Sequence, residues 1–259
     1  MKRRRAGTVQ TRRLGAERGT NLRRTDLGRM IQINPFSVED QHCDAIKYFA
    51  DGGLNATTIK RCIADLQLPL ILPGRALGHQ DTQPTEKMVT GSAAHALALE
   101  GEKVYLARYC VAPDVDRRTK AGKAEFAAYV LKHKNKVVLR PQQDATARSI
   151  AQAINAYPTA RRLLRNGAAE TSVFWTDRAT GIECKARLDY ITEDGTVIDL
   201  KTTADASPDG FERAIRNYRY HVQAAWYRRA LREVRGGDLP AFRFVAVETV
   251  APYSVGVYT

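Results

Sequence analysis

The spacing of apolar residues divides the chain into a helical N-terminal part and a β-rich C-terminal part. Ile59, Ile63 and Leu66 recur at helical spacing behind Asn55, a suitable N-cap, and predict a helix over 55–66. Prolines and glycines predict a loop over 67–84. The other predicted elements of this part are helices over 85–100, 119–133 and 145–165 and a short strand over 137–139.

Strand patterns dominate from Glu170 onward. The runs ETSVFWTD and IECKARLDYI are joined by a turn at 178–181, which predicts a hairpin. The turn Asp194-Gly195 leads into TVIDLKTT, and a helix over 208–234 separates this strand from two more, over 242–248 and 253–258. A strand that crosses over a helix into a parallel neighbour indicates an α/β fold, with a mixed β-sheet core flanked by helices.

Composition narrows the class of protein. The chain of 259 residues is 44% hydrophobic and 27% charged, as in soluble globular proteins. It has neither a membrane-spanning apolar run nor a signal-peptide core, so we expect a cytoplasmic protein without a membrane partner. Its four cysteines are widely separated, which favours reduced thiols over disulfides or a zinc site.

The positive charge is concentrated at the N-terminus. Residues 1–30 hold ten Lys and Arg against Glu17 and Asp26, so +8 of the net +13 lies there. We interpret 1–30 as a basic, disordered arm and 31–259 as the folded domain. The arm could attract nucleic acid, could be a merely solubilising tail, or could precede a true start at Met30.

Three residues of the β-rich part predict metal chemistry. Alternation along TVIDLKTT places Asp199 and Lys201 on one face, and pairing through Asp194-Gly195 brings Asp189 near Asp199. Neighbouring carboxylates repel each other unless a cation lies between them, and such ligands suit Mg²⁺ or Mn²⁺. Lys201 could then orient or deprotonate an attacking water. The alternative is a surface ion pair, but apolar Val197, Ile198 and Leu200 indicate a buried strand.

Two further positions support the same site. Gly91-Ser92-Ala93-Ala94 provides small residues for close helix packing just before His95, and a histidine taken alone is more often a hydrogen-bonded core residue than a ligand. Gln223 and Tyr227 are spaced i, i+4 and so share one helix face, although a half-buried polar stripe would look the same. If His95 binds metal it must be neutral, and we expect Asp189 and Asp199 to raise its pKa.

The ordered motifs GSAAH, ETSVFW, CKARLDY, VIDLKTT, YHVQAAWY and VAVETVAPY resemble the RecE-type exonucleases (exodeoxyribonuclease VIII), in the RecB-like branch of the PD-(D/E)xK nuclease superfamily. The resemblance spans residues 55–259 and includes 111–126. It implies a restriction-endonuclease-like fold and 5′-to-3′ digestion of double-stranded DNA ends. It also implies that His95, Asp189 and Asp199 bind Mg²⁺, or Mn²⁺ in its place, with the Leu200 carbonyl as a further candidate ligand. Lys201 is then catalytic, and Gln223 and Tyr227 support the site and contact DNA. The role of Glu170 stays open.

The resemblance also suggests partners: double-stranded DNA ends, a single-strand annealing protein in phage or prophage-type recombination, and further copies of the chain. Two departures bear on oligomerisation and end-threading: the chain stops at Thr259, and residues 66–87 match the family pattern loosely. The same site would also suit an endonuclease or a single-strand nuclease. A non-catalytic DNA-binding protein is the remaining alternative.

Overall fold

A computed structural model describes residues 53–64 and 84–259. The helices, among which η1 is a π-helix, are α2 (Ala56–Ala64), α4 (Glu86–His95), η1 (Ala96–Glu100), α5 (Glu102–Arg108), α6 (Lys120–Lys132), α7 (Pro141–Ala156), α8 (Pro158–Leu163), α9 (Pro208–Tyr218) and α10 (Tyr220–Arg235). The strands are β1 (Tyr109–Val111), β2 (Val137–Leu139), β3 (Gly167–Thr176), β4 (Glu183–Thr192), β5 (Val197–Thr203), β6 (Phe242–Glu248) and β7 (Val255–Tyr258). The predicted basic arm, and almost all of the loop predicted before α4, lie outside these residues.

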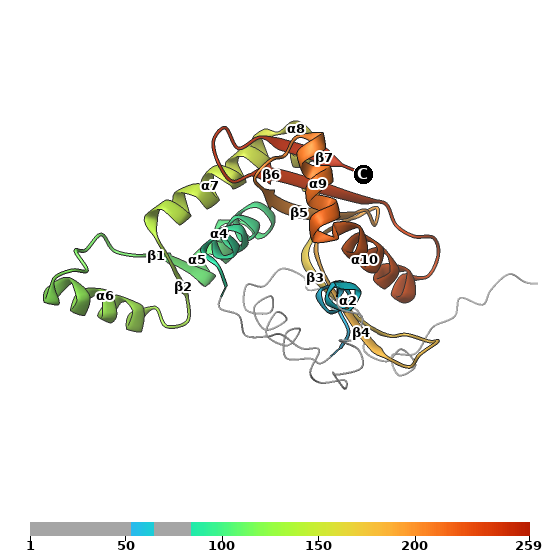
Figure 1. Ribbon diagram of the computed structural model, residues 1–259, viewed down its shortest axis with the longest axis horizontal. Helices are drawn as coiled ribbons and strands as arrows, with labels where there is room; N and C mark the ends of the chain where they lie inside the picture. Colours follow the sequence, from blue (N-terminus) through green and yellow to red (C-terminus); the bar gives the residue numbers. More distant parts are fainter. Residues whose placement is uncertain (1–52, 65–83) are drawn as a thin grey trace, which may run out of the picture.

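The main sheet has five strands in the order β3-β4-β5-β6-β7 (Figure 1). Strands β3, β4 and β5 form an antiparallel meander, and β5 then pairs in parallel with β6. Helices α9 and α10 make the crossover between these two parallel strands. The predicted mixed sheet with a helical crossover is therefore confirmed.

The alternation of side chains along β6 shows how the layers are built. Val245 and Val247 pack with Ile198 and Leu200 against α4, η1 and α7 on one face of the sheet. Phe244 packs on the opposite face, against α9 and the start of α10. The rest of α10, together with α2, covers this second face over β3 and β4. The sheet is thus buried on both faces, which explains the continuous apolar run over 244–247 in β6.

Most of the predicted helix starts are confirmed by their caps. The amide of Thr58 donates to Asn55 Oδ1 at 3.0 Å, as expected for an N-cap at the head of α2. Thr85 and Thr119 cap α4 and α6 in the same way. The helix predicted over 85–100 changes to π geometry after His95.

Two predicted helices were wrong in extent. The helix predicted over 145–165 starts at Pro141, where the absent proline N–H costs nothing, and it is interrupted before Pro158. The helix predicted over 208–234 is interrupted at Arg219, whose left-handed backbone (φ 52°) separates α9 from α10. Neither Gly nor Pro marks this second break.

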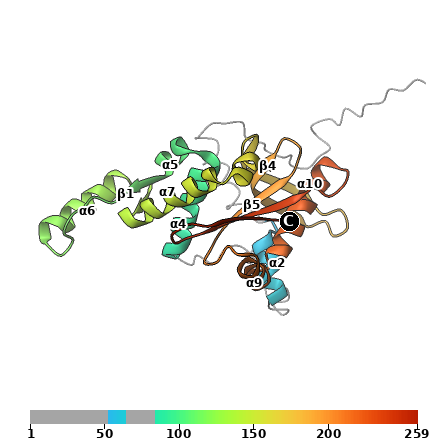
Figure 2. The ribbon, with the colours of Figure 1, turned by 90° about the horizontal axis from the view of Figure 1, so that it is seen from above.

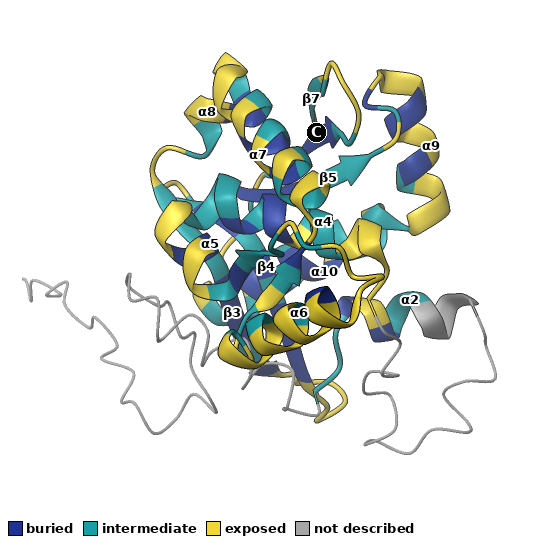
Figure 3. Cartoon of the chain, turned by 90° about the vertical axis from the view of Figure 1, so that its left-hand side faces the viewer, coloured by how far each residue is buried: buried dark blue, intermediate teal, exposed yellow. Residues whose placement is uncertain are grey.

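A smaller unit, β1, α6 and β2, projects from the side of the main body in both ribbon views (Figures 1 and 2). Strand β2 was predicted, whereas its parallel partner β1 and the preceding helix α5 were not. Helix α6 is exposed over most of its surface (Figure 3). No helix within the described residues is long and apolar enough to cross a membrane.

Candidate metal centre and active site

Strand β5 places Asp199 and Lys201 on the face of the sheet that α10 covers. The Asp199 side chain is fully buried and forms an ion pair with Lys201, whose side chain is 13% exposed. The predicted shared face is therefore confirmed, and burial excludes a simple surface ion pair. Burying a charged carboxylate is costly unless it is paired and hydrogen-bonded, and the contact with Lys201 offsets part of this cost for Asp199.

Gln223 on α10 holds the second oxygen of Asp199. Its Nε2 donates to Asp199 Oδ1 and to the Tyr227 hydroxyl, each at 2.9 Å. Its Oε1 accepts a hydrogen bond from Lys60 Nζ on α2, also at 2.9 Å. Donor and acceptor partners at opposite ends fix the orientation of this amide. Gln223 thus connects Tyr227 with Asp199, and the two residues share one helix face as predicted. The contact with Lys60 was not predicted.

Asp189 lies where β4 and β5 separate. Their pairing ends at Tyr190 opposite Ile198, one pair before Asp189 and Asp199 would face each other. The Leu200 amide, which a continued ladder would have paired with backbone, donates instead to Asp189 Oδ2 at 2.9 Å. Asp189 and Asp199 therefore form hydrogen bonds with different partners, although the charge of Asp199 still raises the pKa of Asp189.

Glu170 lies opposite Asp189 on β3, at the one position of this hairpin where the ladder is interrupted. Its backbone is left-handed, with φ 51°, which costs a non-glycine residue about 1–2 kcal/mol. The pleat also changes here: Leu188 packs on the α10 side of the sheet, whereas Tyr190, two residues further along β4, and its cross-strand partner Ala169 pack on the α4 side. A strained residue thus switches the facing of both strands, and such strain is typical of functional sites.

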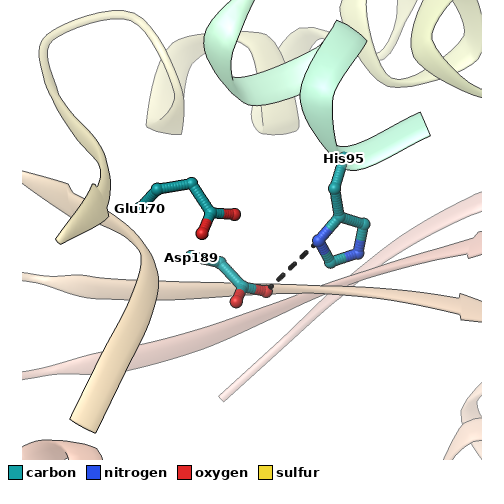
Figure 4. Close-up of side chains that lie close together, drawn as sticks. All are labelled: His95, Glu170 and Asp189. Atoms are coloured by element: carbon teal, nitrogen blue, oxygen red, sulfur yellow. Dashed lines mark ion pairs between the residues drawn. The ribbon is translucent and has the colours of Figure 1, made fainter. Parts of the chain in front are cut away.

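His95 reaches the same point from the last turn of α4. A Cβ on Gly91 would lie 3.2 Å from Thr202 Oγ1, so this glycine lets α4 lie close on β5, as the run of small residues had suggested. His95 Nδ1 is 3.8 Å from Asp189 Oδ2. One potential ligand atom from each of His95, Glu170 and Asp189 lies within 4.8 Å of the others, and the three side chains converge in Figure 4.

Basic side chains surround this acidic group. Arg187 Nε donates to Glu170 Oε2 at 2.7 Å, and the same guanidinium donates to Ser172 Oγ. Behind them, at the end of η1, Glu100 forms a two-pronged pair with Arg108. Burial raises the pKa of Glu100, and the charge of Glu170 adds to that rise. The site thus contains more carboxylates than a metal-free pocket favours.

Burial also dominates the protonation of the central residues. It raises the pKa of Asp189 well above its usual range, and the charge of Asp199 adds to this rise. Burial lowers the pKa of His95, so the expected upward shift was wrong: desolvation outweighs the nearby carboxylates. For Lys201 burial opposes the charged form, but Asp199 and Asp189 together raise its pKa, which keeps it an ammonium.

The donor set fits a small hard cation. Two carboxylates and a neutral imidazole suit Mg²⁺ or Mn²⁺. Ligands of octahedral Mg²⁺ lie about 3 Å apart when adjacent and about 4.2 Å apart when opposite, so these atoms, which lie within 4.8 Å of one another, would have to draw closer together to bind the ion. Asp199 Oδ2 is buried without a hydrogen bond of good geometry, although Lys201 contacts it. This oxygen is a further candidate donor beside the group.

The structure therefore gathers every predicted site residue into one region and adds Glu170 and Lys60. Of the three predicted ligands, His95 and Asp189 belong to the converging group and Asp199 does not. The roles of all three as ligands stay predictions. Glu170 could be suspected only because it begins a strand motif. For Lys60, 163 residues from its partner Gln223, the sequence offered no signal.

Comparisons with known proteins agree with this architecture. The family model described as a PDDEXK-like domain of unknown function (DUF3799) matches residues 75–259. A crystal structure from Eubacterium rectale, described provisionally as an exonuclease, is similar with a TM-score of 0.52 and 11% sequence identity. That similarity covers 87% of this chain and 77% of the other. None of the curated proteins compared with the chain matches it.

Proposed function

Because the chain belongs to the PDDEXK-like family DUF3799, we propose that it is a divalent-metal-dependent deoxyribonuclease that digests double-stranded DNA from its ends. The convergence of His95, Glu170 and Asp189 beside the buried Asp199–Lys201 pair carries this proposal. The family match and the fold support the PD-(D/E)xK nuclease superfamily. The RecE-like motif order supports exonucleolytic action with 5′-to-3′ polarity, and a single-strand annealing protein as a recombination partner.

Each residue has a role in this proposal. His95, Glu170 and Asp189 would hold Mg²⁺ or Mn²⁺, with Asp199 as a further ligand. The bound ion would supply Lewis acidity and a more acidic water. Lys201, kept charged by Asp199, would stabilise the negative charge that builds up on the phosphate. Gln223 and Tyr227 hold Asp199 in place and are positioning residues.

Lys60 is a second amine at the same site. Its Nζ lies 5.3 Å from the centre of the Tyr220 ring, and Lys201 Nζ lies 4.9 Å from the same ring. Burial, and then the charge of Lys201, lowers the pKa of Lys60 to about 8. We assign Lys60 to holding the Gln223 amide and to attracting the phosphate backbone.

Digestion of four DNA forms tests the proposal: linear duplex labelled at the 5′ end, linear duplex labelled at the 3′ end, nicked circles and closed circles. In magnesium we expect early release of the 5′ label, a persisting 3′-labelled strand and intact closed circles. Excess EDTA should stop the reaction. Lys201→Ala should be inactive, and Lys103→Ala, a change at an exposed lysine, should be active.

The other outcomes identify the alternatives. Cutting of closed circles would indicate an endonuclease, and digestion restricted to unpaired strands a single-strand nuclease. DNA binding without cleavage in any metal would leave a non-catalytic binding protein. Full activity in EDTA would refute the metal centre itself.

A further inference from the structure

A cavity of about 760 Å³ is lined by Thr202, which follows Lys201 on β5, and by Tyr220, whose ring the Lys201 ammonium group contacts. It begins where β5 continues past Lys201 into Thr202 and Thr203, and it extends between α4, α7 and α9. Hydroxyl and amide groups dominate its polar lining, including Thr90, Thr146, Gln142, Gln143 and Asn217. Its size and its mixed lining are those of a site for a small polar organic group rather than for a packed side chain.

Two tyrosines form one wall of this cavity. The rings of Tyr218 and Tyr220 are stacked, with centroids 5.6 Å apart and planes inclined by 27°. Residues two apart on a continuous helix do not face each other. They do so here because Arg219 between them is left-handed, the same break that divides α9 from α10. A costly backbone conformation is thus maintained exactly where it aligns two aromatic rings.

The inner ring is fixed and the outer ring is open. Tyr220 packs against Phe211 and Phe244, each with centroids 6.1 Å away, and contacts the ammonium group of Lys201. Tyr218 lies at the edge of the cavity and is 63% exposed. The pair therefore forms a continuous aromatic path from the catalytic lysine outward.

We propose that Tyr218 and Tyr220 are a stacking platform for an unpaired nucleobase of the strand whose phosphate is cut beside Lys201. The inference rests on the proposed nuclease function and specifies how that site takes its substrate. A base can stack on a tyrosine face only after it leaves its partner, so the strand enters the cavity unpaired even when the substrate is a duplex end. Because every base has a π-face, the platform is tolerant of sequence.

The charges around the cavity fit this occupant. Lys87, Arg140 and Arg213 outnumber Glu86 and Asp205 in its lining, so a polyanionic backbone is favoured over a cation. Arg213 and Arg140 are held by Asp205 and Glu86 respectively, which directs them along the wall. The threonine hydroxyls and the amides remain suited to base edges and sugar oxygens.

Short oligonucleotides that carry 2-aminopurine at successive positions from the 5′ end test the platform. Stacking quenches the emission of this base. Binding is measured by titrating each oligonucleotide with the full-length protein in calcium, and the same samples are checked for cleavage of the oligonucleotide. For wild type we expect strong quenching at one or two adjacent positions. Tyr218→Leu should lose this quenching and bind about 5- to 150-fold more weakly, the loss expected for one stacked base.

Two further variants separate stacking from other effects. Tyr218→Phe keeps the ring and should behave as wild type. Tyr157→Leu, at a half-exposed tyrosine outside the cavity, should also leave binding and quenching unchanged. In magnesium, Tyr218→Leu should raise KM more than it lowers kcat.

The inference and the proposed function fail separately. Wild-type binding and quenching in Tyr218→Leu would overturn the platform even if the enzyme digests DNA. A Phe variant as defective as the Leu variant would also overturn it, because the hydroxyl and not the ring would then matter. If wild type cleaves no DNA in magnesium, the nuclease proposal fails, whereas a ring-dependent loss of oligonucleotide binding would still establish the stacking site.

Discussion

Replacing Asp189 by asparagine should stabilise the metal-free protein while removing its response to metal. Potential ligand atoms of Asp189 and Glu170 lie within 4.8 Å. Two unit charges at this separation repel by about 3 kcal/mol at an effective dielectric constant of about 20. Arg187 and Lys201 offset part of this, so we expect a net gain of about 1–2 kcal/mol. Asparagine can still accept the Leu200 amide hydrogen bond, so the backbone contact survives.

Once metal is bound, the Asp189 carboxylate should stabilise the folded protein instead of destabilising it. A ligand at one hundred times its Kd stabilises the folded state by about 2.7 kcal/mol. For a domain of this size each kcal/mol shifts Tm by roughly 2–4 °C. Wild type should therefore gain about 5–10 °C in saturating manganese. Asp189→Asn should start roughly 2–8 °C higher in EDTA and gain almost nothing.

Thermal melts at pH 8 in EDTA and in manganese measure both effects. The sign follows from the raised pKa of Asp189: the folded protein holds its proton longer than the unfolded chain, so stability is lost as the pH rises towards that pKa. Asp114→Asn, at an exposed position, makes the same charge change outside the site and should resemble wild type. If Asp189→Asn melts below wild type in EDTA, or gains as much from manganese, the electrostatic reasoning is wrong.

Three further predictions concern the other groups of the site. Lys201→Ala should keep most of its manganese affinity but lose activity by about 10²-fold or more, whereas Asp199→Ala should lose both. Calorimetry measures the affinity for manganese and turnover assays measure the activity. If both variants lose manganese equally, Lys201 has a structural role instead. His95→Ala should lower manganese affinity without unfolding the protein; an unchanged manganese-induced shift in Tm would make His95 a core residue. The pKa of Lys60 is lowered to about 8 in the folded protein, which therefore binds fewer protons than the unfolded chain above pH 7. Wild type should then gain stability relative to Lys60→Met as the pH rises from 7 to 9. A difference in stability between the two that does not change with pH would refute this.

The strand that carries the Asp199–Lys201 pair could be predicted because the pattern that identifies it lies within a few consecutive residues. Alternation with period two assigns Asp199 and Lys201 to one face from seven consecutive residues, and the apolar flanks indicate burial. The helix caps are local in the same sense. Lys60 could not be found this way, because it meets Gln223 only through the packing of α2 on α10.

The division of α9 from α10 was hidden for a different reason. Asn217-Tyr218-Arg219-Tyr220 contains neither Gly nor Pro, and its apolar spacing continues that of the helix on both sides. Arg219 adopts a conformation that its own propensity disfavours. Packing of Phe211 and Tyr220 on the sheet provides a physical reason for the break. Tertiary contacts here outweigh local preference.

The positions of Asp189 and Glu170 show where the predicted pairing of β4 with β5 no longer holds. Pairing through Asp194-Gly195 does align Asp189 with Asp199 when it is extended by one step, but the ladder ends just before that pair. Glu170, on the other neighbouring strand, breaks the pleat with its left-handed backbone, and Asp189 turns towards His95 on α4. Regular pairing would bring two carboxylates together, whereas the irregular one brings two carboxylates and an imidazole together, a better ligand set for a catalytic cation. The feature that sequence patterns cannot reveal, a strained residue in a strand, is therefore the one that assembles the candidate metal centre.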